Sequence, residues 1–141
     1  MKDLDLLPEA RRQHVAARLH SNLIAWFTTV RDDGQPTTIP VWFLAREDDV
    51  LMFTRPGTRK LRNLSLNPRA VLGLDVTDIG RDNVRIEGVV NIAPDELPAD
   101  RNPAYLAKYT ERIGAMFDDA AAFSAAFSVP LVLTPSRVRT E

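Results

Sequence analysis

The sequence has 141 residues, of which 45% are hydrophobic and 26% are charged, and its formal net charge is −1. This composition predicts one ordinary globular domain spanning residues 1–141, without the strong positive field that broad binding to nucleic acid or membranes requires. The chain has no cysteine, which excludes disulfides, thiolate nucleophiles and cysteine-ligated zinc and makes a reducing cytoplasm the simplest expected location.

The first half of the chain predicts one helix followed by three strands. The expected elements are a helix over residues 8–20 and strands over residues 23–30, 36–44 and 50–54. A turn signal, Arg-Asp-Asp-Gly at residues 31–34, joins the first two strands into a hairpin. Pro40 lies inside the second strand. Because proline has no N–H to donate, this strand is expected at an edge, at a bulge, or where something other than a strand pairs with its backbone.

The second half predicts helices and three further strands. The expected helices cover residues 58–67, 103–109 and 112–127, and the expected strands cover residues 70–76, 84–92 and 130–134. Gly88 interrupts a cleanly alternating strand, which indicates a bulge or a close backbone approach. Successive short connections favour antiparallel pairing. The expected fold is mainly β with flanking helices, a six-stranded antiparallel barrel that removes its own edges.

The stretch from residue 50 to residue 69 carries the strongest functional signal. After an apolar strand and a Pro-Gly turn, Thr58 is expected to begin a helix, with its hydroxyl accepting a first-turn N–H. Arg59 and Lys60 follow where the helix dipole is already positive, so a bound anion would relieve an unfavourable placement. The pattern is therefore typical of a phosphate site. The alternative is a solvated basic helix face with Leu61 and Leu64 turned inward.

Few side chains suit acid–base or metal chemistry. His14 and His20 lie on or beside the first predicted helix, away from any carboxylate cluster with ligand spacing, so no metal site is expected. The paired carboxylates are turn-forming or helical, and no catalytic side chain can be assigned. An anion site without an evident catalytic group is typical of a protein whose bound cofactor carries the reaction.

Several of these motifs together resemble the flavin- and deazaflavin-binding split β-barrels related to pyridoxamine-phosphate oxidase. The resemblance rests on Phe53-Thr54, Gly57-Thr58-Arg59-Lys60, Asn67-Pro68-Arg69, Gly34-Gln35-Pro36, Pro40-Val41-Trp42-Phe43, Gly88 and Lys108-Tyr109. It implies a six-stranded antiparallel split β-barrel that forms a homodimer with cofactor sites at the interface. It also implies cofactor-phosphate contacts from Thr54, Thr58, Arg59 and Lys60, and a wall beside the cofactor ring formed by the backbone of Ile39, Pro40, Val41 and Trp42.

Two departures from the family pattern narrow the expected activity. The second strand lacks the Arg and Lys with which pyridoxamine-phosphate oxidases hold FMN, and the C-terminal segment lacks their Trp- and Arg-bearing motif. The chain is more similar to the actinobacterial branch that uses the deazaflavin coenzyme F-420. This similarity implies hydride transfer between F-420 and a small unsaturated organic substrate.

Three alternative functions and the roles of three aromatic residues remain open at the level of sequence. The protein could be an FMN-dependent oxidoreductase of the same fold or a non-catalytic carrier of a flavin or deazaflavin. Trp42 could stack on a cofactor ring or fill the core, and Tyr105 and Tyr109 could only seal the dimer. A nucleic-acid-binding barrel would use Arg55, Arg59, Lys60, Arg62 and Arg69. Stacking aromatics are not interleaved with these cations, so a nucleic acid is not an expected partner. The net charge of −1 makes a membrane an unexpected partner as well.

Overall fold

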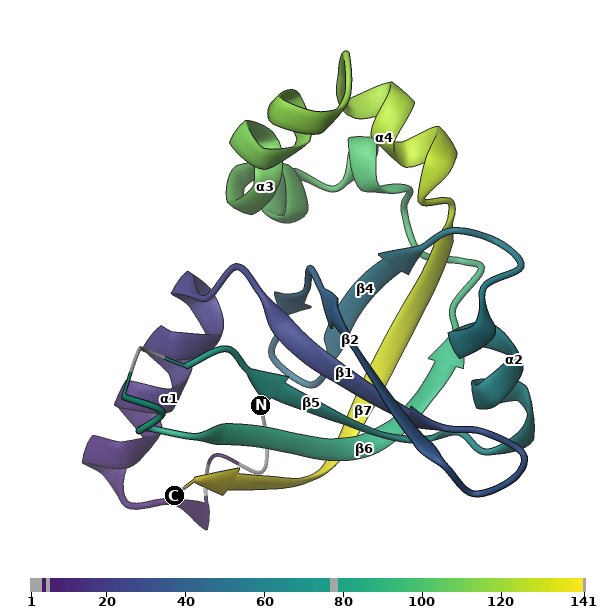
Figure 1. Ribbon diagram of the computed structural model, residues 1–141. Coiled ribbons are helices and arrows are strands. Elements are labelled where there is room, and N and C mark those ends of the chain that lie inside the picture. Colours follow the sequence, from purple (N-terminus) through teal and green to yellow (C-terminus); the bar gives the residue numbers. More distant parts are fainter. Residues whose placement is uncertain (1–3, 5, 77–78, 141) are drawn as a thin grey trace.

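The computed structural model describes residue 4, residues 6–76 and residues 79–140. Seven strands form one antiparallel sheet in the order β2-β1-β5-β6-β7-β4-β3, curled into a half-barrel (Figure 1). The strands are β1 (Ala25–Val30), β2 (Pro36–Val41), β3 (Leu44–Ala45), β4 (Val50–Thr54), β5 (Arg69–Leu74), β6 (Val84–Ile92) and β7 (Val129–Thr140). The helices are α1 (Glu9–Ser21), α2 (Arg59–Leu66), η2 (Ala99–Arg101), α3 (Pro103–Met116) and α4 (Ala120–Ala126). The expected mainly β split barrel is confirmed.

The expected count of six strands is wrong, because the strand predicted over residues 36–44 divides into two. β2 ends at Val41 on one edge of the sheet, and β3 pairs with β4 on the opposite edge. Only Trp42 and Phe43 separate β2 from β3. The two edges of the curled sheet are therefore joined by two residues. Pro40 lies in an edge strand, as its missing N–H predicted.

The last strand is longer than the sequence indicated, since β7 continues to Thr140 and pairs with both β4 and β6. Its pairing with β6 shifts register at Gly88. A Cβ at Gly88 would lie 2.3 Å from the carbonyl oxygen of Thr134. The close backbone approach expected at this glycine is confirmed.

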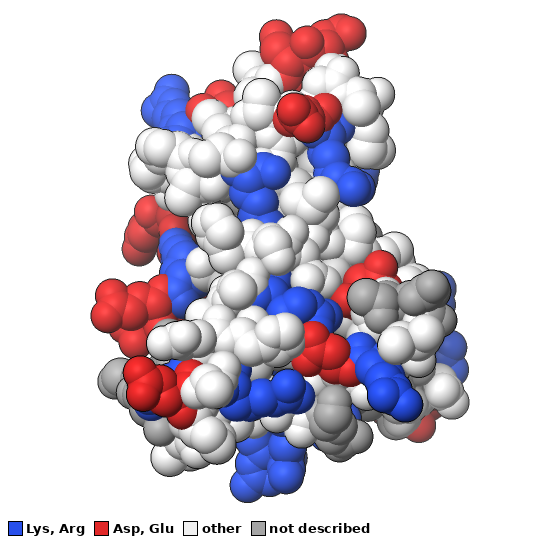
Figure 2. Space-filling view, turned by 90° about the vertical axis from the view of Figure 1, so that its left-hand side faces the viewer, with Lys and Arg blue, Asp and Glu red and all other residues white. Residues whose placement is uncertain are grey.

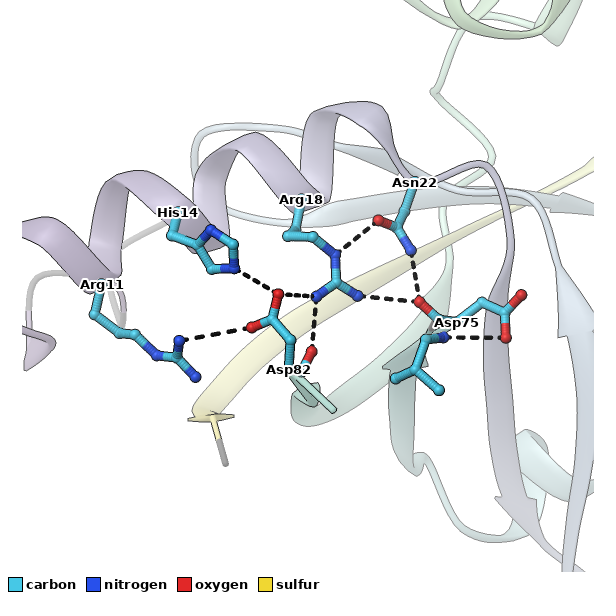
Figure 3. A network of polar contacts seen from close by, with 7 residues as sticks. Arg11, His14, Arg18, Asn22, Asp75 and Asp82 are labelled. Atoms are coloured by element: carbon cyan, nitrogen blue, oxygen red, sulfur yellow. Dashed lines mark hydrogen bonds and ion pairs between the residues drawn. The ribbon is translucent and has the colours of Figure 1, made fainter. Parts of the chain in front are cut away.

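Helix α1 is held to the sheet by polar contacts that converge on Asp82 (Figure 3). The Asp82 carboxylate accepts hydrogen bonds from His14 and Arg18 and forms an ion pair with Arg11. The His14 hydrogen bond is the main cause that lowers the pKa of Asp82. Arg18 and Asn22 both donate to the backbone carbonyl of Asp75, at the end of β5. These contacts fix α1 across the loop between β5 and β6.

The apolar interior has two parts. The barrel core lies inside the curled sheet and includes Phe27, Leu72 and Leu133, all nearly inaccessible to solvent. A second, aromatic-rich cluster lies where α3 and α4 cover one end of the barrel (Figure 1). Asn102 caps α3 by accepting from the backbone N–H of Tyr105, and Asp119 caps α4 in the same way through Ala122. The chain leaves the helix between Phe117 and Asp119, so the helix predicted over residues 112–127 is interrupted.

Candidate cofactor site

The functional signal at residues 50–69 folds into a strand, a turn and a short helix. All five residues of β4 are buried, which explains its continuous apolar character. Gly57 turns the chain with φ of +72°, in the left-handed region that glycine adopts without strain. Thr58 then takes the N-cap position of α2, so the predicted start of the helix is confirmed.

Two threonine hydroxyls at this turn are buried without a hydrogen-bond partner among the described residues: Oγ1 of Thr54 and Oγ1 of Thr58. The prediction that the Thr58 hydroxyl caps the helix is wrong, since the side chain accepts no hydrogen bond from α2. A buried hydroxyl without a partner destabilises a protein by about 1–3 kcal/mol. A ligand oxygen bound at this turn would supply the missing partners.

Lys60 is the basic residue near these hydroxyls that is half-buried, whereas Arg55 and Arg59 are exposed. Burial lowers the pKa of its ammonium group. Within the described part of the chain, Lys60 has no hydrogen bond and no ion pair to offset this desolvation. An anion beside Lys60 would restore the stability of the charged form.

Arg59 does not share the surroundings of Lys60, although the two residues are adjacent. Successive residues of a helix point in directions about 100° apart, because one turn takes about 3.6 residues. Lys60 lines an aromatic cavity, whereas Arg59 and Arg62 line a separate groove of about 140 Å³ that Arg31 and Asp32 also line. The four residues expected around a phosphate are therefore divided, with Arg59 facing a different hollow from Lys60.

The aromatic cavity has a volume of about 200 Å³ and lies between β2, β4 and the two C-terminal helices. Its lining consists of Pro40, Val41, Trp42, Phe53, Lys60, Tyr105, Met116, Phe117, Phe123 and Phe127. Three of the four expected wall residues thus line it, and Ile39 lies beside them on β2 without reaching it. Sequence reasoning missed the phenylalanines of the C-terminal helices. The spacing of Phe123 and Phe127, one helical turn apart, was the available signal.

Trp42 packs against the aromatic-rich cluster between the barrel and helices α3 and α4 of the same chain. Its ring stacks on Tyr109 with centroids 4.9 Å apart and on Phe123 with centroids 5.5 Å apart. Tyr105 and Tyr109 are almost fully buried, and burial raises the pKa of both phenols above their usual value. Both tyrosines therefore pack α3 onto the barrel of their own chain.

Lys108 and Tyr109 both contact the backbone of Phe43, next to Trp42. The Lys108 ammonium donates to the carbonyl oxygens of Phe43 (2.9 Å) and Leu19 (3.3 Å). Burial lowers the pKa of Lys108 to about 8. These contacts fix the segment that carries Trp42 against α3.

The cations considered for nucleic-acid binding do not share one environment. The Arg55 guanidinium lies 4.7 Å from the centre of the Phe127 ring, Lys60 lines the cavity, and Arg59 lines the separate groove. On the side of the molecule that carries α1, basic and acidic residues are interspersed (Figure 2). Among the described residues, no helix is both long and apolar enough to cross a bilayer.

Comparison with known proteins supports the interpretation of the fold. A family model described as pyridoxamine 5′-phosphate oxidase matches residues 12–140. No curated protein matches the sequence. A solved structure of an F420 reductase is 24% identical to this chain, with a TM-score of 0.70, and the match covers 94% of this chain and 98% of that chain.

Two further solved structures share the fold at lower identity. An FAD-binding protein from Mesorhizobium loti is 17% identical, with a TM-score of 0.65, and the match covers 89% of this chain and 88% of that chain. The heme storage protein HutZ from Vibrio cholerae is 12% identical, with a TM-score of 0.64 and coverage of 91% and 92%. Proteins named for different ligands thus share this architecture, so the fold alone does not identify the ligand of this chain.

Proposed function

Because this chain belongs to the pyridoxamine 5′-phosphate oxidase family, we propose that it is an oxidoreductase that binds the deazaflavin coenzyme F-420. The reaction is hydride transfer between this cofactor and a small unsaturated organic substrate. The likeness to the F420 reductase supports the choice of cofactor. A reducing cytoplasm suits the cysteine-free chain.

The observation that carries this proposal is the set of unpartnered polar groups on the segment that runs from the end of β4 to the first turn of α2. The hydroxyls of Thr54 and Thr58 are buried without partners among the described residues, and Lys60 is partly desolvated without a described anion. All three can donate hydrogen bonds, and a phosphate ester offers only acceptors at neutral pH. The donor set therefore fits the phosphate that F-420 and FMN have in common.

The cofactor ring would lie along the cavity wall formed by Pro40, Val41 and Trp42. β2 has a strand neighbour on one side only, so part of its backbone N–H and C=O groups are free to bind a polar ring edge. The bound deazaflavin or flavin supplies the hydride chemistry. The residues of the chain hold the phosphate, orient the ring and exclude water with aromatic side chains.

The proposal favours F-420 over FMN because of where the cations lie. β2 supplies no cation, whereas Arg59 and Arg62 line a groove beside the start of α2. F-420 carries additional carboxylates in its oligoglutamate tail, and these would meet the two arginines. FMN is the second candidate, because the two hydroxyls and Lys60 are sufficient for its single terminal phosphate.

A non-catalytic carrier is the third candidate. It is favoured by one observation: the cavity lining contains no carboxylate and no histidine among the described residues. Turnover of cofactor with a panel of conjugated substrates separates an enzyme from a carrier.

We further propose a homodimer whose cofactor sites lie at the interface. The cavity of about 200 Å³ is smaller than the roughly 300–1,000 Å³ of typical cofactor pockets, so one chain supplies only part of the walls. Large apolar side chains are also exposed: Trp26, Ile39, Leu66, Ile92, Leu97 and Met116. A second copy that covers such a surface would complete the site.

The test is titration of the purified protein with F-420 and with FMN, followed by absorption and fluorescence. Lys60→Ala is expected to weaken binding of the preferred cofactor by roughly 1.5–3 kcal/mol, which is about ten- to hundredfold. Arg101→Ala removes an exposed cation on η2 and serves as the control. If the Lys60 variant binds both cofactors as tightly as the wild type, the phosphate assignment is wrong.

A further inference from the structure

We propose that Asn63 is a positioning residue for the phosphate site, because its side-chain amide fixes α2 against the hairpin formed by β1 and β2. The inference rests on the proposed function of the start of α2. Asn63 is only 4% exposed, although it is one of the most polar residue types. Its buried amide therefore needs a specific explanation.

The amide of Asn63 contacts both strands of the hairpin. Nδ2 donates to Oγ1 of Thr29 at 3.0 Å and lies 3.4 Å from Oγ1 of Thr37. Thr29 on β1 is directly opposite Thr37 on β2, and their hydroxyl oxygens are 3.4 Å apart. One side chain thus ties the helix to two neighbouring strands in a single polar cluster.

The position of α2 depends strongly on such a contact. The helix has eight residues, and a helix of this length is marginal without tertiary support. Its other anchors, Leu61 and Leu64, pack on the barrel core, but apolar contacts are non-directional and tolerate small rotations. Hydrogen bonds to two fixed hydroxyls define one orientation of the helix about its axis.

The orientation of α2 about its axis decides where its phosphate-binding side chain, Lys60, points. Lys60 precedes Asn63 by three residues, so the two side chains are neighbours on the helix surface. A rotation that broke the amide contacts would also move Lys60 away from the cavity. The same hairpin leads through β2 to Pro40 and Val41 on the cavity wall. Asn63 therefore fixes the phosphate-binding groups of α2 relative to the hairpin that carries the ring wall, and the hairpin itself is held by its own strand pairing.

The experiment measures the phosphate-dependent part of binding, as the ratio of dissociation constants for a phosphate-free and a phosphorylated ligand. Riboflavin and FMN differ by the phosphate alone, so this pair isolates the phosphate contribution. The phosphate-free deazaflavin alcohol and F-420 form a second pair, whose ratio contains the oligoglutamate tail as well as the phosphate. Asn63→Ala is expected to lower the ratio for riboflavin and FMN at least fivefold, while the affinity for the phosphate-free ligand changes less than twofold. Thr29→Val removes the acceptor from the opposite side and should act in the same direction. If Asn63→Ala does not fold, Thr29→Val decides.

The control is Ser65→Ala on the exposed side of α2, where the hydroxyl donates to the carbonyl of Arg62 and to no other residue that the structure describes. It should leave the ratio unchanged. Lys60→Ala distinguishes the positioning role of Asn63 from the proposed phosphate site. If Lys60→Ala lowers the ratio to about one, and neither Asn63→Ala nor Thr29→Val lowers it, the positioning role is wrong and the proposed function stands. If Lys60→Ala also has no effect, the phosphate site and this inference both fail. A lowered melting temperature with an unchanged ratio would mean that Asn63 is merely structural.

Discussion

Tyr109 accepts a hydrogen bond from the backbone N–H of Phe43 at 2.8 Å, across a sequence separation of 66 residues. This bond lies where the chain leaves β2 and has not yet entered β3, so no strand neighbour serves this N–H. The Tyr109 oxygen also lies 2.8 Å from the carbonyl oxygen of Leu23, to which it donates. One phenol therefore satisfies the backbone at the point where the two edges of the sheet meet.

Tyr109→Phe should lower the free energy of unfolding by about 1–3 kcal/mol, because it leaves the buried N–H of Phe43 without an acceptor. Tyr105→Phe is the matched control, since the Tyr105 hydroxyl makes no hydrogen bond to any residue that the structure describes. It should lower stability by less than half as much. Urea unfolding of both variants measures the difference, and equal losses would contradict the role given to the Tyr109 hydroxyl.

Thr54→Val should raise the stability of the cofactor-free protein and weaken cofactor binding at the same time. Valine has nearly the shape of threonine and removes a buried hydroxyl that has no described partner, which should stabilise the fold by about 1 kcal/mol. The same hydroxyl is a proposed phosphate donor, so the variant should bind less tightly. Thermal unfolding and cofactor titration check the two effects. A loss of stability in the cofactor-free variant would show that the hydroxyl has an internal partner.

The free energy of unfolding should rise between about pH 8 and pH 10 because of Lys108. Burial lowers its pKa to about 8 in the folded protein, whereas the ordinary pKa of a lysine is 10.5. Between these values the unfolded chain binds more protons than the folded chain, so stability increases with pH. Above about pH 10 the two buried tyrosines oppose the trend, because their pKa values are raised on folding.

Urea unfolding at pH 7.5 and pH 9.5 isolates the lysine contribution when wild type is compared with Lys108→Met. The variant should show a smaller increase over this interval. A remaining increase is expected from Lys60, whose pKa is lowered in the same direction. An identical increase in both proteins would mean that Lys108 is not desolvated.

F-420 should bind at least several-fold more tightly than FMN, and this advantage should shrink as salt rises. The additional carboxylates of F-420 would meet Arg59 and Arg62 in an open groove, where ionic screening acts beyond about 8 Å at physiological salt. Titration calorimetry at two ionic strengths measures both effects. Arg62→Ala should reduce the advantage without changing the affinity for FMN. If the wild type binds FMN more tightly than F-420, FMN is the cofactor and the preference for F-420 is wrong.

The protein should be a dimer at micromolar concentration in the presence of cofactor. Obligate interfaces commonly bury more than about 2,000 Å², and exposed residues such as Trp26 and Ile39 provide apolar surface for one. Analytical ultracentrifugation gives the mass directly. A purely monomeric protein that still binds cofactor with full affinity would exclude a site shared between two chains.

Local patterns in the sequence were sufficient for much of the fold. The hairpin, the edge position of Pro40 and the close approach at Gly88 follow from backbone chemistry that a few neighbouring residues determine. The break after Val41 was missed because Trp42 and Phe43 have high strand propensity, and the contact that removes them from the ladder comes from Tyr109. The continuation of β7 was missed because Pro135 and two arginines obscured its alternation.

The candidate site shows the same limit. The motif around Thr58 identified the phosphate-like turn, but the separation of Arg59 from Lys60 depends on how α2 packs against the hairpin. Asn63 gave no signal in the sequence, because its partners Thr29 and Thr37 are brought to it only by the tertiary fold. Contacts between distant segments decide these details, and no local pattern encodes them.

The double pairing of β7 has a consequence for the order in which the protein can fold. Without residues 129–140, the sheet consists of two separate pieces, β2-β1-β5-β6 and β4-β3. During synthesis these pieces cannot join until β7 has left the ribosome, although β4 was made about 75 residues earlier in the chain. Until then β4, whose five residues are all buried in the finished fold, has only the two residues of β3 as a strand neighbour. The nascent chain therefore carries an apolar strand that waits for its principal partner, which is the state in which chaperone protection matters most.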